Sequence, residues 1–371
     1  MTPGGESHTI SSATAVAEDI AGQVGDVDME QRIAAILDDS DYPGAMLEIL
    51  AETEREAIRN ALEQRRKRKA CGDDSNDGVP VDARTASIHL IVQLAGHCGV
   101  DQADIGKAVG LLDLVLSCLP KKEALRRLPA ITVAVLRLVQ ALDGGSRRMH
   151  PLEYNSAEEA LMQWLVDTGH VDPASQPDGA NEKASKPEMA EHIAKTRMVA
   201  QERSVLELLQ WRINVTSAEE WLRAFCARLG LITNVALKRS LDWVLEQSIF
   251  LATTMMLQAT VVDLPPRELA LGALCHGLIS ARLISVDLFR KAEKGDEWLY
   301  VFARSQPGFQ LPQCALPIPT QRTIFQRLEA STDASAVELQ RSLTGLLTHF
   351  APKMCAQAIG HSTPGSMRLR A

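Results

Sequence analysis

Residues 129–142 are apolar on almost every face of a helix, and this segment constrains the possible folds more than any other. Side chains such as Ile131 and Val135 follow one another with hardly a charge between them, until Gly144 and Gly145 end the run. A helix that is hydrophobic all round is buried at the centre of a helical domain. The sequence therefore predicts a helical domain built around this segment.

Helical patterns recur along most of the chain. Ser217 and Glu220 have the spacing of a capping box at a helix start, Pro265-Pro266 is suited to a helix opening, and Gly230 is a natural helix end. The expected helices cover about residues 43–69, 82–95, 105–119, 129–142, 156–166, 188–209, 217–230, 236–257, 265–279 and 336–350.

The composition agrees with an all-helical protein. The chain has 371 residues, of which 46% are hydrophobic and only 4% aromatic, and no pair of alternating runs flanks a hairpin turn. Ala and Leu, which are plentiful, have high helix propensity. The net charge of −8 argues against a broad basic surface for nucleic acid.

Two successive groups of about five helices are expected, each around a central apolar helix. The predicted divisions are a disordered N-terminus (1–42), an N-terminal helix with a basic linker (43–79), a first helical domain (80–215) with a flexible insertion at about 169–188, a second (216–320), and a C-terminal helix and tail (321–371).

Neither a catalytic centre nor a metal site or cofactor is expected. The seven cysteines are scattered singly, which favours small buried side chains in a reducing compartment. His97-Cys98 and Cys275-His276 are lone adjacent pairs without a third ligand, so core packing is the favoured interpretation. No apolar stretch is long enough to span a bilayer, and no signal peptide is visible.

The basic run at residues 65–69 has two interpretations. Cations at the end of a helix complement its dipole, and a run of this composition also resembles a nuclear import signal.

Several motifs in residues 80–285 resemble those of the cyclins. The first cyclin box opens with an arginine and continues to a Leu-Leu-Asp motif. It ends in Glu-Arg, an apolar pair, a Trp and a Val-Thr link. The second box has a Pro-Pro run. The matching residues are Arg84, Leu111-Leu112-Asp113, Glu202-Arg203, Leu208-Leu209, Trp211, Val215-Thr216 and Leu264-Pro265-Pro266.

The resemblance implies an all-α fold of two tandem five-helix cyclin boxes with an N-terminal helix. It implies that the chain binds and activates a cyclin-dependent serine/threonine protein kinase in cell-cycle control, in the nucleus and cytoplasm. No enzyme activity of its own, no direct nucleic acid, no membrane and no small-molecule substrate are expected.

The resemblance also assigns roles to residues. Arg84, Asp113, Leu128 and Trp211 match signature positions that are largely structural, while Glu202 matches the glutamate that contacts the kinase. A lysine that shares this contact is missing. Its place is taken by Ala141, or by Val139 under another alignment, and the acidic residue that follows survives as Asp143.

That departure leaves alternatives open. Arg137, one turn before Ala141, could supply a cation, and Glu202 could instead be a solvated surface charge. The substrate-docking patch of many cyclins is also eroded, with Leu90 at its Trp position. A cyclin-fold adaptor or transcription-linked scaffold that activates no kinase is therefore the second hypothesis.

Overall fold

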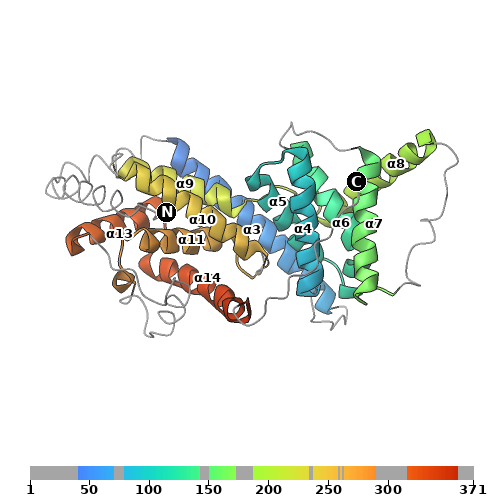
Figure 1. Cartoon of the computed structure of the whole chain (residues 1–371). Helices are drawn as coiled ribbons and strands as arrows, with labels where there is room; N and C mark the ends of the chain where they lie inside the picture. Colours follow the sequence, from blue (N-terminus) through green and yellow to red (C-terminus); the bar gives the residue numbers. More distant parts are fainter. Residues whose placement is uncertain are drawn as a thin grey trace, which may run out of the picture. The chain divides into compact units, whose positions relative to one another are not determined.

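A computed structural model describes residues 41–70, 79–142, 150–172, 187–233, 237–257, 260, 263–289 and 316–357 (Figure 1). The predicted N-terminal disorder up to residue 40, Asp143 and most of the predicted insertion lie outside these residues.

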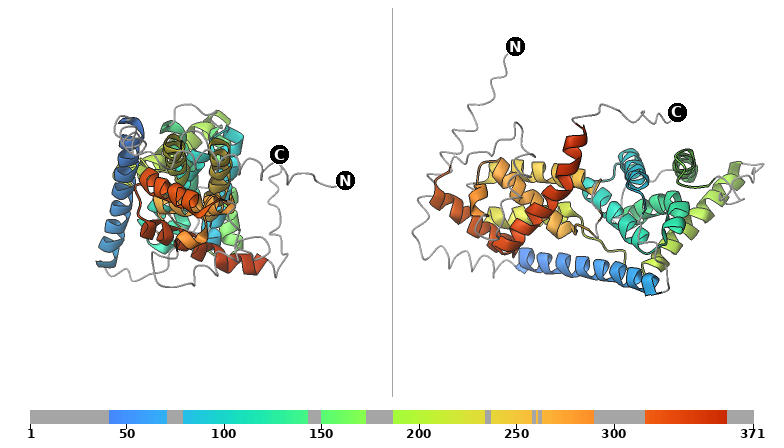
Figure 2. Two further views of the ribbon diagram at one scale, coloured as in Figure 1. Left: turned by 90° about the vertical axis from the view of Figure 1, so that its left-hand side faces the viewer. Right: turned by 90° about the horizontal axis from the view of Figure 1, so that it is seen from below.

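The described residues form eleven α-helices and one short 3-10 helix, and contain no strand. This confirms the predicted all-α class. Figure 2 shows the long N-terminal helix as one continuous rod. The helices are α3 (Asp41–Ala70), α4 (Val81–Cys98), α5 (Gln102–Ser117), α6 (Lys121–Leu142), α7 (Pro151–Asp167), α8 (Pro187–Leu208), α9 (Ala218–Ile232), α10 (Lys238–Met256), α11 (Pro266–Ser280), η3 (Val286–Leu288), α13 (Ile318–Thr332) and α14 (Ala336–Gln357).

The chain divides into two compact units. The N-terminal unit comprises Leu37–Ala224 and Ala252–Ala270, and the C-terminal unit takes in Phe225–Leu251 and Leu271–Ala371. The boundaries expected from the sequence, after residues 215 and 320, stay predictions.

Helix α6 is the centre of the N-terminal unit, because α4, α5, α7 and α8 all pack against it. Its side chains from Ile131 to Leu136 are buried without exception, as the apolar pattern predicts. The core cluster of this unit includes side chains from α3 to α8.

The prediction that this central helix begins at residue 129 is wrong. Helix α6 begins at Lys121, and Pro129 lies inside it. A proline within a helix lacks the N–H that would bond to the preceding turn, a cost of about 3 kcal/mol. Burial of Ala124, Leu125 and Leu128 on the preceding turns offsets that cost.

The start of α9 is as predicted, but its end is not. The Glu220 amide donates to the Ser217 hydroxyl (3.2 Å), and the Ser217 amide donates to the Glu220 carboxylate (2.8 Å), which completes a capping box. The helix continues past Gly230 to Ile232, whose side chain is buried at 3% exposure. Burial of Ile232 thus favours two further helical residues over an end at the glycine.

In the C-terminal unit, glycines allow helices to approach closely. A methyl group on Gly272 of α11 would lie 2.5 Å from the carbonyl oxygen of Ser342 in α14. Phe289 and Phe325 meet edge to face with ring centroids 5.0 Å apart.

Helix α13, which carries Phe325, was not predicted from the sequence.

None of the helices in the described ranges combines the length and apolar character needed to cross a membrane.

Candidate partner-binding site

The first two signature residues form a buried ion pair in the N-terminal unit. Arg84 on α4 donates from Nε to Asp113 Oδ1 (2.6 Å) and from Nη2 to Oδ2 (2.8 Å). Both residues are only 5% exposed. Two parallel charge-assisted hydrogen bonds fix the relative position of α4 and α5. Such deep burial agrees with the structural role that the resemblance implies for this pair.

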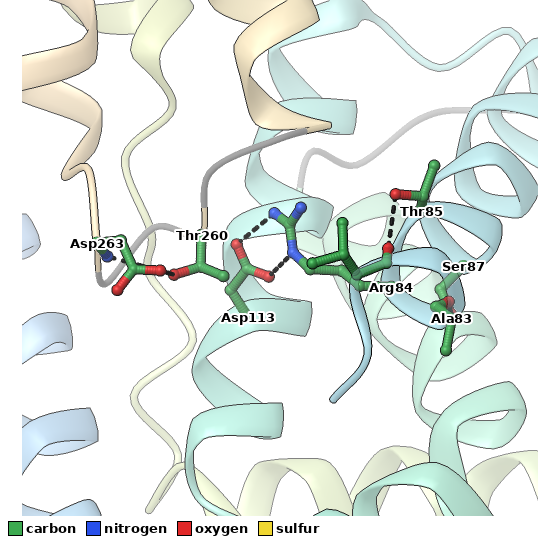
Figure 3. A network of polar contacts seen from close by, with 8 residues as sticks. Ala83, Arg84, Thr85, Ser87, Asp113, Thr260 and Asp263 are labelled. Carbon is green, nitrogen blue, oxygen red and sulfur yellow. Dashed lines mark hydrogen bonds and ion pairs between the residues drawn. The ribbon is translucent and has the colours of Figure 1, made fainter. Parts of the chain in front are cut away.

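A second acidic group reinforces this pair. Asp263 accepts a hydrogen bond from the Thr260 hydroxyl (2.6 Å) in the segment that precedes α11 (Figure 3). Burial by itself lowers the pKa of the Arg84 guanidinium, but the charge and hydrogen bonds of Asp113, together with the charge of Asp263, raise it overall. Arg84 is therefore held in its charged form.

Glu202, the predicted kinase contact, forms an ion pair within the chain. Its Oε1 lies 2.8 Å from Nε of Arg137, and the two side chains are 20% and 22% exposed. The guanidinium carbon of Arg137 also lies 5.4 Å from the centre of the Tyr154 ring. This arrangement joins α8 to α6 and α7 at a half-buried surface position.

Two further sets of polar contacts lie on the same three helices. The Tyr154 hydroxyl donates to Gln140 Oε1 (3.0 Å), and Arg197 and Gln201 on α8 donate to Glu158 on α7 (2.6 and 3.1 Å). Burial raises the pKa of Glu158, although the charge of Arg197 opposes that shift. We refer to Arg137, Gln140, Tyr154, Glu158, Arg197, Gln201 and Glu202 as the α6–α8 polar cluster.

Three buried atoms of this cluster have no hydrogen-bond partner among the described residues: Arg137 Nη1, Gln140 Nε2 and Gln201 Oε1. Leaving a buried donor or acceptor unsatisfied costs about 1–3 kcal/mol. A buried polar atom without a partner in a folded protein calls for an explanation, and a role in a functional site is one possible explanation. Similar buried atoms occur elsewhere among the described residues, at Asn60 Nδ2 and Gln340 Oε1 for example, so this feature alone does not mark a functional site.

The remaining predicted residues contribute no side-chain contact to this cluster or lie outside the described residues. Ala141 is exposed at the last turn of α6 beside Leu142, which is 53% exposed, and Asp143 lies outside the described residues. Leu128 is fully buried. Trp211 is 65% exposed and has a positive φ of 64°, directly after α8, so it contributes little to the core.

One buried acidic residue was missed by the sequence analysis. Glu54 of α3 is 8% exposed, and its Oε2 accepts hydrogen bonds from Trp221 Nε1 (2.7 Å) and from the backbone N–H of Arg267 (3.0 Å). Burial raises the pKa of Glu54 to about 7, although both hydrogen bonds oppose the shift. Glu54 thereby accepts a hydrogen bond from a backbone N–H in the first turn of α11. This helix starts at two prolines and has no Ser, Thr or Asp cap of its own.

A signal for this contact was present but weak. Glu54 lies between Ala51 and Ala57 on the face of α3 that also carries the buried Leu47 and Ala61. An acidic residue at an apolar helix position predicts a buried partner. The sequence does not say which partner, because Trp221 and Arg267 are distant along the chain.

Cysteine and histidine side chains form no metal site in the part of the chain that the structure describes. These residues contain no group of three His, Cys, Asp or Glu side chains that could hold a metal ion. Cys98, Cys226 and Cys275 are buried free thiols. Burial raises the pKa of the Cys275 thiol and lowers that of the neighbouring His276 to about 4, so both are neutral near pH 7; Cys275 is fully buried and His276 is partly buried.

The chain matches no protein-family model and no curated protein. The likeness to cyclins therefore depends on the sequence motifs quoted above.

Proposed function

We propose that this chain is a cyclin-like regulatory subunit, which binds a cyclin-dependent serine/threonine protein kinase and shifts it toward its active arrangement. The buried Arg84–Asp113 pair carries the proposal. These two residues were singled out by resemblance alone, and they meet with two hydrogen bonds of 2.6 and 2.8 Å. This pairing supports the proposal, because the resemblance predicts that the two residues meet.

The order and packing of the helices support the same proposal. Five consecutive helices, α4 to α8, include a central α6 that contacts the other four. Glu202 lies on α8 where it meets α6, and it keeps one-fifth of its side-chain surface exposed. A partner helix or loop that docks across α6 and α8 could therefore reach this carboxylate. The proposal gives the chain itself no catalytic residue.

Activation requires tighter binding to the active than to the inactive kinase. The test is affinity capture of the tagged full chain from its own cells, with a kinase assay on the captured material. We expect Glu202→Lys to reduce both kinase recovery and activity by about tenfold or more, because a cation replaces a carboxylate at the contact.

A matched control is available on the same helix. Glu207 is 56% exposed and pairs with Arg203 at 2.8 Å, so Glu207→Lys reverses one exposed charge on α8 without touching Arg137. This variant should capture kinase as the wild type does. Equal capture by a folded Glu202→Lys variant would count against the proposed contact.

A second candidate function is a cyclin-fold adaptor that activates no kinase. It is favoured by the exposed Ala141, where the family has a lysine, and by the engagement of Glu202 with Arg137 inside the chain. An adaptor would recover a stable partner without any gain in phosphorylation, so the same capture experiment distinguishes the two.

The proposal also covers location. The basic run at residues 65–69 forms part of the C-terminal end of α3, whose last residue is Ala70. We propose that it serves nuclear import in addition to its place at the helix end, and that the protein occupies nucleus and cytoplasm.

A further inference from the structure

Helix α10 of the C-terminal unit has an inner face that is fixed against α11, and the two helices lie side by side in Figure 1. The Ser248 hydroxyl donates to the backbone oxygen of Ala273 in α11 (3.0 Å), and a methyl group on Gly277 of α11 would lie 3.1 Å from the Val244 side chain. Val244 and Ser248 are buried, with exposed fractions of 0% and 1%. These contacts determine which face of α10 turns outward.

The outward face of α10 carries two aromatic side chains. Trp243 and Phe250 are 43% and 70% exposed, and residues seven apart in a helix lie on one face, about two turns from each other. Both lie inside the helix, whereas the other exposed large apolar side chains described in this unit, Leu231 and Ile318, lie at or next to helix ends. Exposed aromatic side chains grouped in this way are typical of interaction surfaces.

Acidic side chains flank the exposed tryptophan. Asp242 directly precedes Trp243, and Glu246 follows one turn later on the same side of α10. Both carboxylates are exposed, and neither pairs with a cation among the described residues. Negative charge that the chain does not compensate, placed beside exposed aromatic rings, favours a partner that carries Lys or Arg.

The charge of this face disfavours three other occupants. A second copy that docked through the same face would bring Asp242 and Glu246 against an identical acidic patch, since a two-fold contact pairs a surface with itself. Nucleic acid and anionic membrane surfaces would be repelled in the same way.

The form of the partner segment follows from the backbone of α10. Its N–H and C=O groups are bonded within the helix, so α10 offers no strand edge to which an extended segment could add. A helix satisfies its own backbone groups and can lay an apolar stripe along a neighbouring helix.

We propose that the outward face of α10, defined by Asp242, Trp243, Glu246 and Phe250, docks a basic amphipathic helix of a partner protein. Apolar side chains of that helix cover the two aromatic rings, and Lys or Arg beside them meets the two carboxylates. This inference is independent of the proposed function, because the α10 face belongs to the C-terminal unit and Glu202 to the N-terminal unit.

The probe is a synthetic amphipathic helix of Leu and Lys, about 18 residues long so that it forms a helix. A matched peptide has Glu in place of every Lys. Fluorescence anisotropy of the labelled peptides with the full chain measures both affinities, and the Lys peptide should bind the more tightly. Trp243→Ala should weaken binding of the Lys peptide about thirtyfold, because tryptophan anchors supply much of the energy of an interface.

Reversal of both acids tests the charge of the partner. In the double variant Asp242→Lys, Glu246→Lys, the preference should be exchanged, so that the Glu peptide binds more tightly than the Lys peptide. Trp211→Ala is the matched control, because Trp211 is 65% exposed and belongs to the N-terminal unit. This control should bind the Lys peptide as the wild type does.

Urea unfolding of each variant separates loss of docking from loss of folding. If Trp243→Ala unfolds at a lower urea concentration than the wild type, Phe250→Ser repeats the test at a side chain that is 70% exposed. The proposal is overturned if the wild type binds neither peptide or both alike, or if folded variants of the α10 face bind the Lys peptide as the wild type does. A wild type that sediments as a dimer, with Trp243→Ala a monomer, would assign the face to a second copy and also overturn the proposal.

Discussion

The likeness to cyclins depends mostly on single residues. For the Arg84–Asp113 pair, the sequence predicted which residues matter but not how deeply they are buried. The motif spacing identified both residues, yet only the fold shows that each is 5% exposed. Such burial makes the pair costly to break, because one charge left alone in the interior lacks compensation from water.

Arg84→Met should therefore destabilise the chain by about 3–5 kcal/mol, since the Asp113 carboxylate would remain buried without its cation. Urea denaturation followed by circular dichroism measures this change. The double variant Arg84→Met, Asp113→Leu removes both charges and should recover most of the loss. A single variant as stable as the wild type would contradict the assignment of this pair as a structural link.

Glu202 illustrates the limit of prediction at the residue scale. The motif placed it on a helix near the partner surface, and the structure places it on α8. Its bond to Arg137 could not be predicted, because it depends on how α8 lies against α6. Periodicity shows which face of a helix is buried, but not which residues of two helices meet.

Helices were predictable wherever apolar spacing was strong, and less so where packing overrides local preference. Starts at Ser217 and Pro266 follow from capping and proline chemistry, which act within one turn. Pro129 inside α6 and the passage of α9 beyond Gly230 depend on burial supplied by other helices. Local rules therefore misplaced those two ends.

Glu54 attaches α3 to Trp221 and Arg267, and its raised pKa makes the stability of the chain depend on pH. The folded chain holds the pKa of this carboxyl at about 7, against 4.5 for an unperturbed glutamate. The folded state thus binds the proton more tightly than the unfolded state. The free energy of unfolding should fall as pH rises from about 4.5 to about 7, by up to about 3 kcal/mol, and level off outside that window.

Glu54→Gln removes this titration and should flatten that part of the pH profile. Denaturant unfolding at pH 5 and pH 8 gives the comparison. Glu52→Gln is the control, because Glu52 is exposed on the same helix and pairs with Arg55 at 3.0 Å. If the Glu54→Gln variant lost as much stability between the two pH values as the wild type does, Glu54 would not be the titrating group.

At the scale of the whole molecule, the sequence predicted the all-α class, and the domain boundaries expected after residues 215 and 320 stay predictions. The N-terminal unit includes Ala252–Ala270, which follows a stretch belonging to the other unit. Helix patterns are read along the chain, so they favour consecutive domains. A unit completed by a later segment can be recognised only from contacts between distant residues.

The N-terminal unit should therefore not fold stably from residues 41–215 alone. That fragment lacks Trp221 and Arg267, the two hydrogen-bond partners of Glu54, and Thr253, whose hydroxyl accepts from Gln102 at 2.5 Å. Without those partners, no hydrogen bond compensates the buried Glu54 carboxyl for its lost hydration, so this residue destabilises the fragment.

We expect the fragment to unfold at a lower urea concentration than the full chain and with a shallower transition, because its native state buries less surface. The substitution Glu54→Leu sharpens the comparison. In the full chain this substitution leaves the Trp221 and Arg267 donors without an acceptor, and each should lower the free energy of unfolding by about 1–3 kcal/mol. In the fragment it removes an unsatisfied acid, so the free energy of unfolding should stay the same or rise. A fragment that unfolds as cooperatively as the full chain, with the same response to Glu54→Leu, would show that residues 41–215 form a complete domain and that the later segment only adds to it.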